Sequence, residues 1–533
     1  MSREVSTECL IIGAGPAGLQ ASYLLTRSGR DHLVLEAGDA PGAFFTRFPR
    51  HRTLISINKP NTGWDDPELN LRTDWNSLLS EDPSLLFTAY TPRYFPAADD
   101  FVRYLADFAT KNDLPIRHGT TVVSVTRPDD FVVRDERGDT YRTRRLIVAT
   151  GVSKPYVPDI EGVEHAELYT DVSVDPADFT GQRVLIIGRG NSAFETADNL
   201  VETAAVIHVA GPGSLKFAWQ THFVGHLRAV NNNFLDTYQL KSQNALLDGK
   251  VLSIRRDGGG YVVPVSFARV AERVKEIRYD RVILATGFRF DASIFAPECR
   301  PQLTINDRFP DQNAAWESVN VPDLFFAGTI TQGRDFKKST SGFIHGFRYG
   351  VRALHRILEH RYHGVAWPAT DLSPTPEAVA DAVIARVNRT SALWQLFAFM
   401  ADAVLAGPDG SLRYAEEVPV AHLHEAVERG DFGDIDSYLT VTLEYGADHD
   451  QVNPFDITAG RVSQENTSGL DGRYLHPVVR HFRRAEHRTP RAGELVGEHH
   501  LTENLENEWD SDDVHRAPLI AFLRTQFAAV GAR

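Results

Sequence analysis

Two stretches of the chain show the same order of hydrophobic and polar positions. An apolar run over Glu8–Ile12 precedes a glycine turn, a helical pattern over Ala17–Ser28 and a second apolar run over Leu33–Glu36. The same order recurs over residues 183–209, with its helical pattern at Ser192–Glu202. A strand, a helix and a strand in succession predict a βαβ unit and therefore a parallel sheet.

Two further apolar runs end in the same three letters. LIVATG closes at Gly151, and VILATGF spans Val282–Phe288. LFFAGT follows at Leu324–Thr329, and then a long helical pattern from about Gly342 to His360. Two βαβ openings with two ATG closures indicate that one domain is inserted into another. The predicted outer domain comprises residues 1–155 and 280–362, and the inner domain residues 156–279.

The pattern over residues 363–533 predicts a separate, mixed α+β region of unknown role. A proline-containing stretch marks a linker, and Thr375-Pro376 suits a helix start, with Thr as the N-cap and Pro at the first helical position. The apolar stretch Ser391–Ala406 contains Asp402 and is too short to span a bilayer, so it predicts a buried or interfacial helix. Ser437–Gly446 alternates like a half-buried strand. The aromatic residues after Ser391 indicate a core or a homodimer contact.

Composition narrows the class of protein. The 533 residues carry a net charge of −15, which argues against nucleic acid or an anionic membrane as the main partner. Cys9 and Cys299 are the two cysteines, so closely spaced dithiols and disulfide frameworks are excluded. The start of the chain is short and polar, without the pattern of a signal peptide, and we expect a cytoplasmic protein. No spacing of histidines indicates a metal site.

The first glycine turn has the spacing of a dinucleotide site. In GAGPAG, Gly13 allows a sharp turn, Gly15 lets the backbone approach a pyrophosphate, and Gly18 lets the helix pack on the strand. Pro16 and Ala17 open the helix, whose N–H groups and dipole favour phosphate. Glu36 ends the second strand, where its carboxylate would accept hydrogen bonds from a ribose diol.

The second turn, GRGNSA, repeats this pattern from Gly188 to Ala193, with Arg189, Gly190, Asn191 and Ser192 between them. No acid follows its second strand, which ends at Val209. Such a site does not repel a 2′-phosphate, and Arg189 or Lys216 is placed to contact one, so NADPH is favoured over NADH. Two nucleotide sites in one chain imply electron transfer between them, and FAD with NAD(P)H is the natural pair.

These motifs together resemble those of the flavin-containing and N-hydroxylating monooxygenases. Whole segments are more similar to the FAD-dependent oxidoreductase domain-containing family, that of the endoplasmic-reticulum flavoprotein associated with degradation, and to its bacterial members. The segments are FFTRFPRHRTLISINK (44–59), LRTDWNSLL (71–79), YFPAADDFVRYL (94–105), NNNFLDTYQLKSQ (231–243) and FKKSTSGFIHGFRYG (336–350). The resemblance covers most of the first 360 residues and extends weakly to HPVVRHFRR (476–484).

The resemblance implies further cofactor-binding residues. They are Thr150 and Gly151, Thr286 and Gly287 in the two ATG turns, and Gly328 in the third flavin motif. Thr329 follows Gly328 as in monooxygenases, where disulfide reductases carry Asp, so a disulfide reductase is disfavoured. The monooxygenase signature is present only in outline. IEGVEHAELY (160–169) lacks one residue between Gly162 and His165.

Asn58 is the catalytic candidate. The resemblance aligns it with an asparagine beside the reactive flavin carbon, where an amide stabilises a flavin hydroperoxide; the alternative is a turn cap before Lys59-Pro60. Arg47 and Arg50 are expected to contact FAD phosphates; the alternative is that they are loop residues without a binding role. The helix that begins near Gly342, with Thr340 and Ser341 as hydroxyl caps, is expected to direct its positive end at the flavin pyrimidine ring.

These observations predict an α/β protein in which an NAD(P)H domain is inserted in an FAD domain. We expect NADPH to reduce FAD, O₂ to form a C4a-hydroperoxide, and one oxygen to pass to a small nucleophilic substrate. The N-hydroxylating resemblance suggests an amine or amino acid. An NAD(P)H oxidase or reductase without oxygen transfer is one alternative. A flavin-stabilised interaction protein with little turnover is another.

Overall fold

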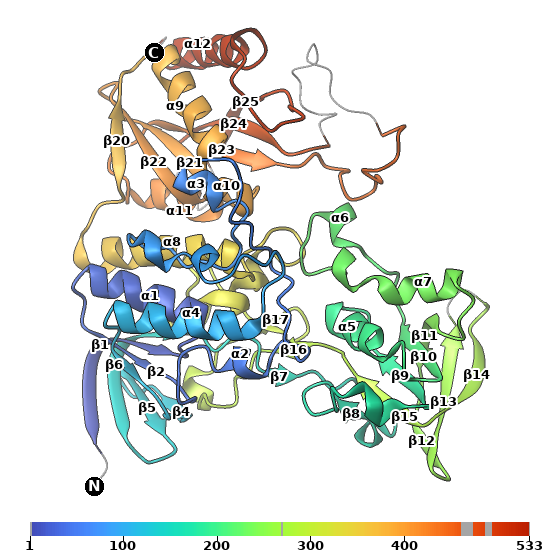
Figure 1. Cartoon of the computed structure of the whole chain (residues 1–533). Helices are drawn as coiled ribbons and strands as arrows, with labels where there is room; N and C mark the ends of the chain where they lie inside the picture. The colour runs from blue at the N-terminus through green and yellow to red at the C-terminus, as the bar shows by residue number, and fades with distance from the viewer. Residues whose placement is uncertain (1–2, 268–269, 460–472, 485–492, 532–533) are drawn as a thin grey trace.

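The computed structural model describes residues 3–267, 270–459, 473–484 and 493–531. Three parts are visible in Figure 1: a sheet with helices at the lower left, a second sheet at the lower right, and a third sheet at the top. The first two contain the parallel strands that the βαβ patterns predict, so the α/β class with two Rossmann-like sheets is confirmed.

The first sheet has strand order β3-β2-β1-β6-β5-β4, with β19 beside β6. β1 pairs in parallel with β2 and β6, and Leu10 lies opposite Leu33 and Leu146. Its strands are β1 (Glu4–Ile12), β2 (His32–Leu35), β3 (Ile116–Arg117), β4 (Val122–Thr126), β5 (Phe131–Asp135), β6 (Thr140–Val148) and β19 (Leu324–Phe326). Its helices are α1 (Pro16–Arg27), α2 (Phe44–Arg47), α4 (Ala98–Lys111) and α8 (Ile344–His363), whereas α3 (Pro67–Asn70) lies beside the sheet at the top of Figure 1.

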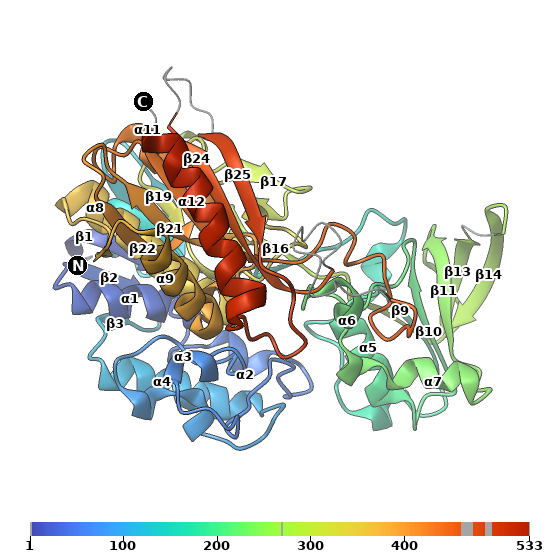
Figure 2. The same cartoon turned by 90° about the horizontal axis from the view of Figure 1, so that it is seen from above.

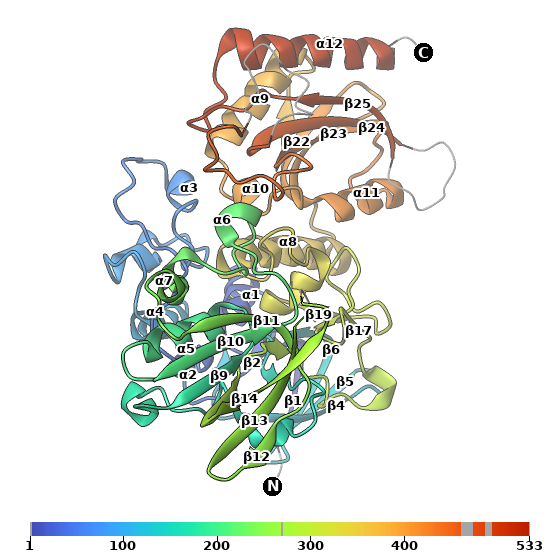
Figure 3. The ribbon, with the colours of Figure 1, turned by 90° about the vertical axis from the view of Figure 1, so that its right-hand side faces the viewer.

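The second sheet has strand order β12-β13-β11-β10-β9-β15-β8, with β14 beside β13. Its strands are β8 (Glu167–Leu168), β9 (Arg183–Ile187), β10 (Val206–Gly211), β11 (Ala245–Val251), β12 (Arg255–Asp257), β13 (Gly260–Phe267), β14 (Arg273–Tyr279) and β15 (Arg281–Leu284). Its helices are α5 (Asn191–Leu200), α6 (Ala218–Thr221) and α7 (Asn233–Gln239). Figure 3 shows this sheet from its own side.

One predicted domain limit does not follow the sheets. β15 pairs with β9 and β8 in the second sheet, although a limit at residue 280 would assign it to the outer domain. The chain returns to the first part through β16 (Phe288–Arg289), which pairs antiparallel with β7 (Lys154–Pro155). We therefore propose that the inner domain runs from about residue 156 to 287.

The third sheet is antiparallel, in the order β20-β22-β21-β23-β24-β25. Its strands are β20 (Ala369–Leu372), β21 (Met400–Ala406), β22 (Leu412–Pro419), β23 (Ser437–Glu444), β24 (His476–Arg483) and β25 (Glu494–His500). Its helices are α9 (Pro376–Arg389), α10 (Ala392–Gln395), α11 (Val420–Arg429) and α12 (Ala517–Gly531). Seen from above in Figure 2, α9 and α12 lie over this sheet.

Two predictions for the C-terminal region are wrong and one is confirmed. The stretch Ser391–Ala406 is not one helix, because α10 ends at Gln395 and β21 begins at Met400. β23 is buried along both faces rather than one, since the sheet lies between α9 and α12 on one side and α10 and α11 on the other (Figure 3). The helix start at Thr375 is confirmed, and its hydroxyl accepts a hydrogen bond from Ala378 N–H at 3.2 Å.

The C-terminal region shares its core with the first part. One hydrophobic cluster runs from α1, α4 and α8 into α9, β21 and β23, whereas the second part has clusters of its own. Buried charges cross the same boundary. Arg352 of α8 pairs with Glu417, and Arg386 of α9 pairs with Glu68 at 3.0 Å. The C-terminal region is thus packed on the first part along α8 rather than linked loosely to it.

Candidate functional site: two glycine turns and the start of α8

The first glycine turn has the shape that a pyrophosphate requires. Gly13 has φ +104°, and a Cβ there would lie 2.8 Å from the carbonyl oxygen of Ala149. A Cβ on Gly18 would overlap the carbonyl oxygen of Gly13. A Cβ added to Gly15 would meet no atom within 4 Å, which leaves the backbone open to a ligand. This cradle fits the diphosphate of FAD.

Glu36 lies directly against this turn and is almost completely buried. Its Oε2 accepts a hydrogen bond from Ala14 N–H at 2.7 Å, and its Oε1 accepts one from Gly38 N–H at 2.8 Å. The carboxylate therefore holds two backbone loops together at the end of β2. Pro16 begins α1 and Ala17 lies in its first turn, as the spacing predicted.

The two ATG turns pass beside the two glycine turns. Gly151 and Gly287 have positive φ, at +65° and +86°, and each follows a threonine, Thr150 or Thr286. The Thr286 hydroxyl donates to the carbonyl oxygen of Tyr156 at 2.5 Å. Gly328 has φ +83°, and a Cβ there would lie 2.7 Å from the Cβ of Ala17. The third motif thus packs on the first turn of α1.

The approach to α8 differs from the prediction. Phe343 is the N-cap and makes no side-chain cap. The Thr340 hydroxyl donates to the carbonyl oxygen of Gln395 at 2.5 Å, and the Ser341 hydroxyl donates to Asp335. Neither hydroxyl therefore caps the helix, because both are used to hold the preceding loop. Gly342 is required here, since a Cβ would meet the Gln332 side chain at 2.8 Å.

Asp335 anchors this loop. Its carboxylate is 4% exposed and accepts from both the hydroxyl and, at 3.0 Å, the N–H of Ser341. Burial raises the pKa of Asp335 to about 6, against the lowering effect of these hydrogen bonds. The sequence does not single out this residue, because a lone Asp in a loop carries no spacing signal.

Asn58 is fully buried. Its Nδ2 donates to the carbonyl oxygens of Thr91 at 2.8 Å and Arg93 at 3.2 Å. Because both neighbours are acceptors, the orientation of the amide is determined. Its Oδ1 is buried and has no partner among the described residues. Asn58 therefore does not act as a turn cap.

Backbone pairing connects Asn58 to α8. Asn58 bridges Asp74, and the ring of the next residue, Trp75, stacks on His345 with centroids 4.3 Å apart. His345 lies in the first turn of α8, and both of its ring nitrogens are buried without partners among the described residues. Burial lowers its pKa well below the usual value, so it is neutral. No spacing in the sequence indicates this pair.

The second glycine turn follows the same path as the first. Gly188 has φ +136°, and a Cβ there would overlap the carbonyl oxygen of Ala285. No atom lies within 4 Å of a Cβ placed on Gly190, so this backbone is open to a ligand as well. Ser192 lies in the first turn of α5, beside Tyr169.

Arg189 has an acidic partner that the sequence did not reveal. Its Nη2 donates to Asp248 Oδ1 at 2.6 Å and to the carbonyl oxygen of Leu247 at 2.7 Å. Asp248 lies in β11, opposite Gly211 at the end of β10. An acid therefore lies beside the end of the second strand after all, supplied by the neighbouring strand. Lys216, the other phosphate candidate, is exposed.

Asn191 connects the second turn to the Asn58 segment. Its Nδ2 donates to the carbonyl oxygen of His226 at 2.9 Å, and its Oδ1 accepts from Arg228 N–H at 2.9 Å. The Arg228 side chain donates to the carbonyl oxygen of Ile55 at 2.8 Å and lies over the Trp75 ring. Residues of the second part thus contact the side of the first part that carries Asn58.

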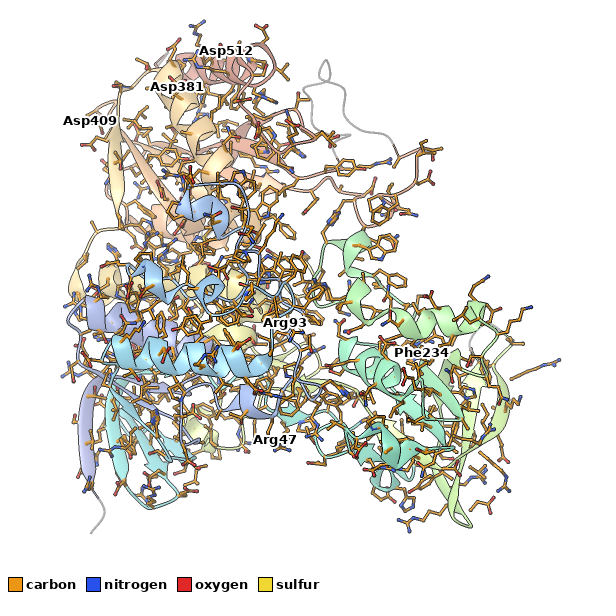
Figure 4. All side chains as sticks on the ribbon, viewed as in Figure 1. Arg47, Arg93, Phe234, Asp381, Asp409 and Asp512 are labelled. Atoms are coloured by element: carbon orange, nitrogen blue, oxygen red, sulfur yellow. The ribbon has the colours of Figure 1, made fainter. Side chains whose placement is uncertain are left out.

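Arg47 and Arg50 lie at the boundary of the two parts. Arg47 donates to the carbonyl oxygen of Thr170 at 3.0 Å, and Arg50 donates to that of Val172 at 2.5 Å. Figure 4 shows Arg47 between the parts, with Phe234 inside the second. In this arrangement both side chains bind the 170–172 segment, and their contact with FAD phosphates stays a prediction.

Both cysteines are buried and free. Burial raises the pKa of Cys299 and raises that of Cys9 to about 12, so neither thiol ionises at neutral pH. Within the described ranges, no helix is long and apolar enough to cross a membrane.

Two glycine turns, each following a parallel strand pair of a mixed sheet, together with the start of a long helix, define a flavoprotein oxidoreductase with two dinucleotide-binding domains. The pyridine nucleotide-disulphide oxidoreductase family model matches residues 10–328. The chain is 39% identical to mouse FAD-dependent oxidoreductase domain-containing protein 2, over 96% of this chain and 83% of that protein. It therefore belongs to the family of FAD-dependent oxidoreductase domain-containing protein 2.

Two solved structures share the fold to the same extent. A flavin-containing monooxygenase from Stenotrophomonas maltophilia is 22% identical, with a TM-score of 0.53, over 66% of this chain and 98% of that one. The bacillithiol disulfide reductase Bdr (YpdA) from Staphylococcus aureus is 20% identical, with a TM-score of 0.52, over 67% and 99%. Since a monooxygenase and a reductase fit equally well, the fold does not select the reaction.

Proposed function

We propose that this FAD-dependent oxidoreductase is an NADPH-using monooxygenase that transfers one oxygen atom from O₂ to a small nucleophilic substrate, an amine or amino acid being the first class to test. FAD, when bound, supplies hydride acceptance and oxygen activation. The chain's part is to hold two nucleotides, to exclude water and to place hydrogen-bonding groups. A cytoplasmic location remains a prediction.

The observation that carries the proposal is the unpartnered Oδ1 of Asn58. Its amide N–H groups are held by Thr91 and Arg93, so the free oxygen is a fixed acceptor in a buried place. A preorganised acceptor costs no rearrangement when a donor develops opposite it. We infer that this oxygen accepts a hydrogen bond at the reactive edge of the flavin, close to the start of α8.

The positive end of α8 and neutral His345 suit the same site. The helix is 20 residues long, so its N-terminal dipole favours negative charge that develops on the pyrimidine ring. His345 remains uncharged because of its burial and the neighbouring charges of Arg348 and Arg228. The residues proposed to hold FAD are Gly13, Gly15, Pro16, Ala17, Gly18, Glu36, Thr150, Gly151, Gly328, Thr340, Ser341 and Gly342.

The proposed nicotinamide site comprises Gly188, Arg189, Gly190, Asn191, Ser192, Thr286 and Gly287. The phosphate roles expected of Arg47 and Arg50 would require these side chains to leave the carbonyl oxygens of Thr170 and Val172.

An NAD(P)H oxidase or reductase is the second candidate, and the 160–169 segment favours it. Gly162 is packed on the carbonyl oxygen of Ile254, with φ +75°, and Tyr169 donates to Glu195 at 3.3 Å. Gly162 is therefore used within the second domain, and the Tyr169 hydroxyl also accepts from Arg50 N–H of the first part at 3.4 Å. Such packing contacts suit a structural role better than a coupling of nicotinamide binding to oxygen transfer.

The first test is stopped-flow spectroscopy of the FAD-loaded protein, reduced anaerobically with NADPH and mixed with oxygenated buffer. A near-ultraviolet species that persists before the oxidised flavin bands return supports oxygen transfer. Direct return to oxidised flavin, with and without amine substrates, favours the oxidase or reductase.

Asn58→Ala sharpens this test. We expect several-fold more hydrogen peroxide released per NADPH oxidised, because the fixed acceptor is removed. Asn76→Ala is the matched control: it removes another fully buried amide of the same region, one bonded to Ser56 and Ile57. Equal peroxide release from wild type and Asn58→Ala would return Asn58 to a structural role.

A further inference from the structure

A cavity lies between the C-terminal half of α8 and α11. Its volume is about 660 Å³, within the range of small-molecule sites. Ile357 lines it, thirteen residues along α8 from Ile344. At 1.5 Å per residue, that is roughly 20 Å from the end proposed to face the flavin. The cavity is therefore separate from the nucleotide sites.

The floor of this cavity is apolar and aromatic. It comprises Ile357, Trp367, His422, Ala426 and Phe432, each at most 8% exposed. The rings of Trp367 and Phe432 meet at an angle of 53°, with centroids 6.2 Å apart, and form a corner. The Trp367 N–H donates to the carbonyl oxygen of Glu416 at 3.1 Å, so this ring is held in place. A flat apolar molecule finds preformed contact area there.

The rim of the cavity is charged, but its charges are already paired. Arg361 donates to Glu317 at 2.8 Å, and Arg429 donates to Asp431 at 2.7 Å. Asp323 accepts from Tyr362 at 2.5 Å and from Arg127 at 3.1 Å. A charged ligand would have to break one of these pairs, whereas a neutral ligand leaves them intact.

His422 is the polar group of the floor. It is 5% exposed, and its Nδ1 is buried without a partner among the described residues. Burial, with a further contribution from Arg429, lowers the pKa of His422 to about 3, so the ring is neutral. A neutral imidazole keeps one donor and one acceptor, so this ring can offer a hydrogen bond to a neutral ligand without breaking an ion pair.

We propose that this cavity binds a neutral, planar aromatic or heteroaromatic molecule, which packs against Trp367 and Phe432 and hydrogen-bonds to the imidazole of His422. The bound molecule contacts α8 of the first domain and α11 of the C-terminal region at once. It thereby stabilises the packing between them, because a ligand that binds only the folded state raises its stability.

The test follows Trp367 directly. The full-length, FAD-loaded protein is labelled with 5-fluorotryptophan, and the resonance of Trp367 among the seven tryptophans is assigned with Trp367→Phe. Indole, which donates, and quinoline, which accepts, are the neutral probes; benzoate and benzylammonium are the charged ones. We expect at least one neutral probe to shift the Trp367 resonance with saturation, and neither charged probe to do so.

Two variants and one control locate the site. Ala426→Leu fills the floor and should abolish the shift, while Ala421→Leu, at an exposed position of α11, should leave it unchanged. His422→Phe keeps the ring and removes the hydrogen bond, and should weaken binding about tenfold. Flavin absorbance and reduction by NADPH should be unaffected in all three.

The proposal fails if no neutral probe moves the Trp367 resonance at low millimolar concentration, or if a charged probe binds in preference. It also fails if folded Ala426→Leu still shows the shift. Should Ala426→Leu lose its flavin through misfolding, His422→Phe decides the matter, because unchanged affinity in that variant contradicts the assigned role of His422.

Discussion

The two βαβ units of this protein follow one backbone path but differ in how closely the helix approaches the strand. In the first, a Cβ on Gly18 would overlap the carbonyl oxygen of Gly13. In the second, Ala193 occupies the corresponding position and its Cβ is accommodated without exposure. The first helix therefore lies nearer its glycine turn. The same glycine motif is thus compatible with two different distances between the helix and its glycine turn.

The units also differ in charge. The acid at the first turn, Glu36, comes from the end of the unit's own second strand and binds Ala14 N–H. At the second turn the acid is Asp248 from β11, and it is paired with Arg189. The first turn therefore holds a carboxylate that is bonded to its own backbone, and the second turn holds an ion pair. The comparison predicts a permanently bound nucleotide in the first and an exchangeable one in the second.

The largest expected effect comes from exchanging the residues at the last motif position. Gly18→Ala should give protein without yellow flavin, because the added methyl group cannot be placed without moving α1. Ala193→Gly should keep FAD and retain reduction by NADPH, with a stability loss of about 1 kcal/mol. Absorbance at the flavin bands and melting temperature measure both. Normal flavin content in Gly18→Ala would remove the distinction between the two units.

The second comparison uses positions where a methyl group meets no protein atom. Gly15 and Gly190 both have open space around a Cβ, so Ala at either position should fold normally. We expect Gly15→Ala to lose FAD, and Gly190→Ala to keep FAD but lose reduction by NADPH by at least a hundredfold. Unimpaired reduction in Gly190→Ala would exclude the second turn as the nicotinamide site.

A smaller effect is expected at the ion pair. Arg189→Gln should weaken the preference for NADPH over NADH about tenfold, because a charged hydrogen bond to the 2′-phosphate is lost. Asp248→Asn should change the preference in the opposite direction. The ratio of kcat/KM for the two nucleotides measures this. If the ratio in each variant equals that of the wild type, neither side chain contacts the adenosine ribose.

The smallest effect concerns stability and pH. Position 195 on α5 corresponds to Gln20 on α1, and burial raises the pKa of Glu195 to about 7 from 4.5. Because the pKa of Glu195 is higher in the folded than in the unfolded protein, its contribution to the free energy of unfolding is fully present below about pH 4.5. This contribution is lost as the pH rises through about 7. Between about pH 5.5 and 8.5, the melting temperature of the wild type should fall a few degrees more than that of Glu195→Gln. Melting temperatures that change equally with pH in the two proteins would contradict the raised pKa of Glu195.

Local patterns were sufficient for the two glycine turns, because the fingerprint depends on backbone freedom at fixed spacing. Gly13, Gly18 and Gly188 are restricted by the contacts that the motif implies. The same reasoning placed the N-cap at Thr375. It was wrong for the stretch after Ser391, where an apolar run without a clear period divides into a short helix and a buried strand. Such runs are ambiguous in sequence because burial on all sides removes the periodicity.

By itself, the sequence determined the α/β class, the two nucleotide motifs and the family, since these depend on short-range spacing and on similarity along the chain. The tertiary structure alone decided which partners those residues meet. It brought Asp248 to Arg189 from a neighbouring strand, Trp75 to His345 across the start of α8, and His422 to the cavity beside Trp367. The physical reason is that charge pairing, stacking and burial act between residues far apart in the chain, where spacing in the sequence carries no information.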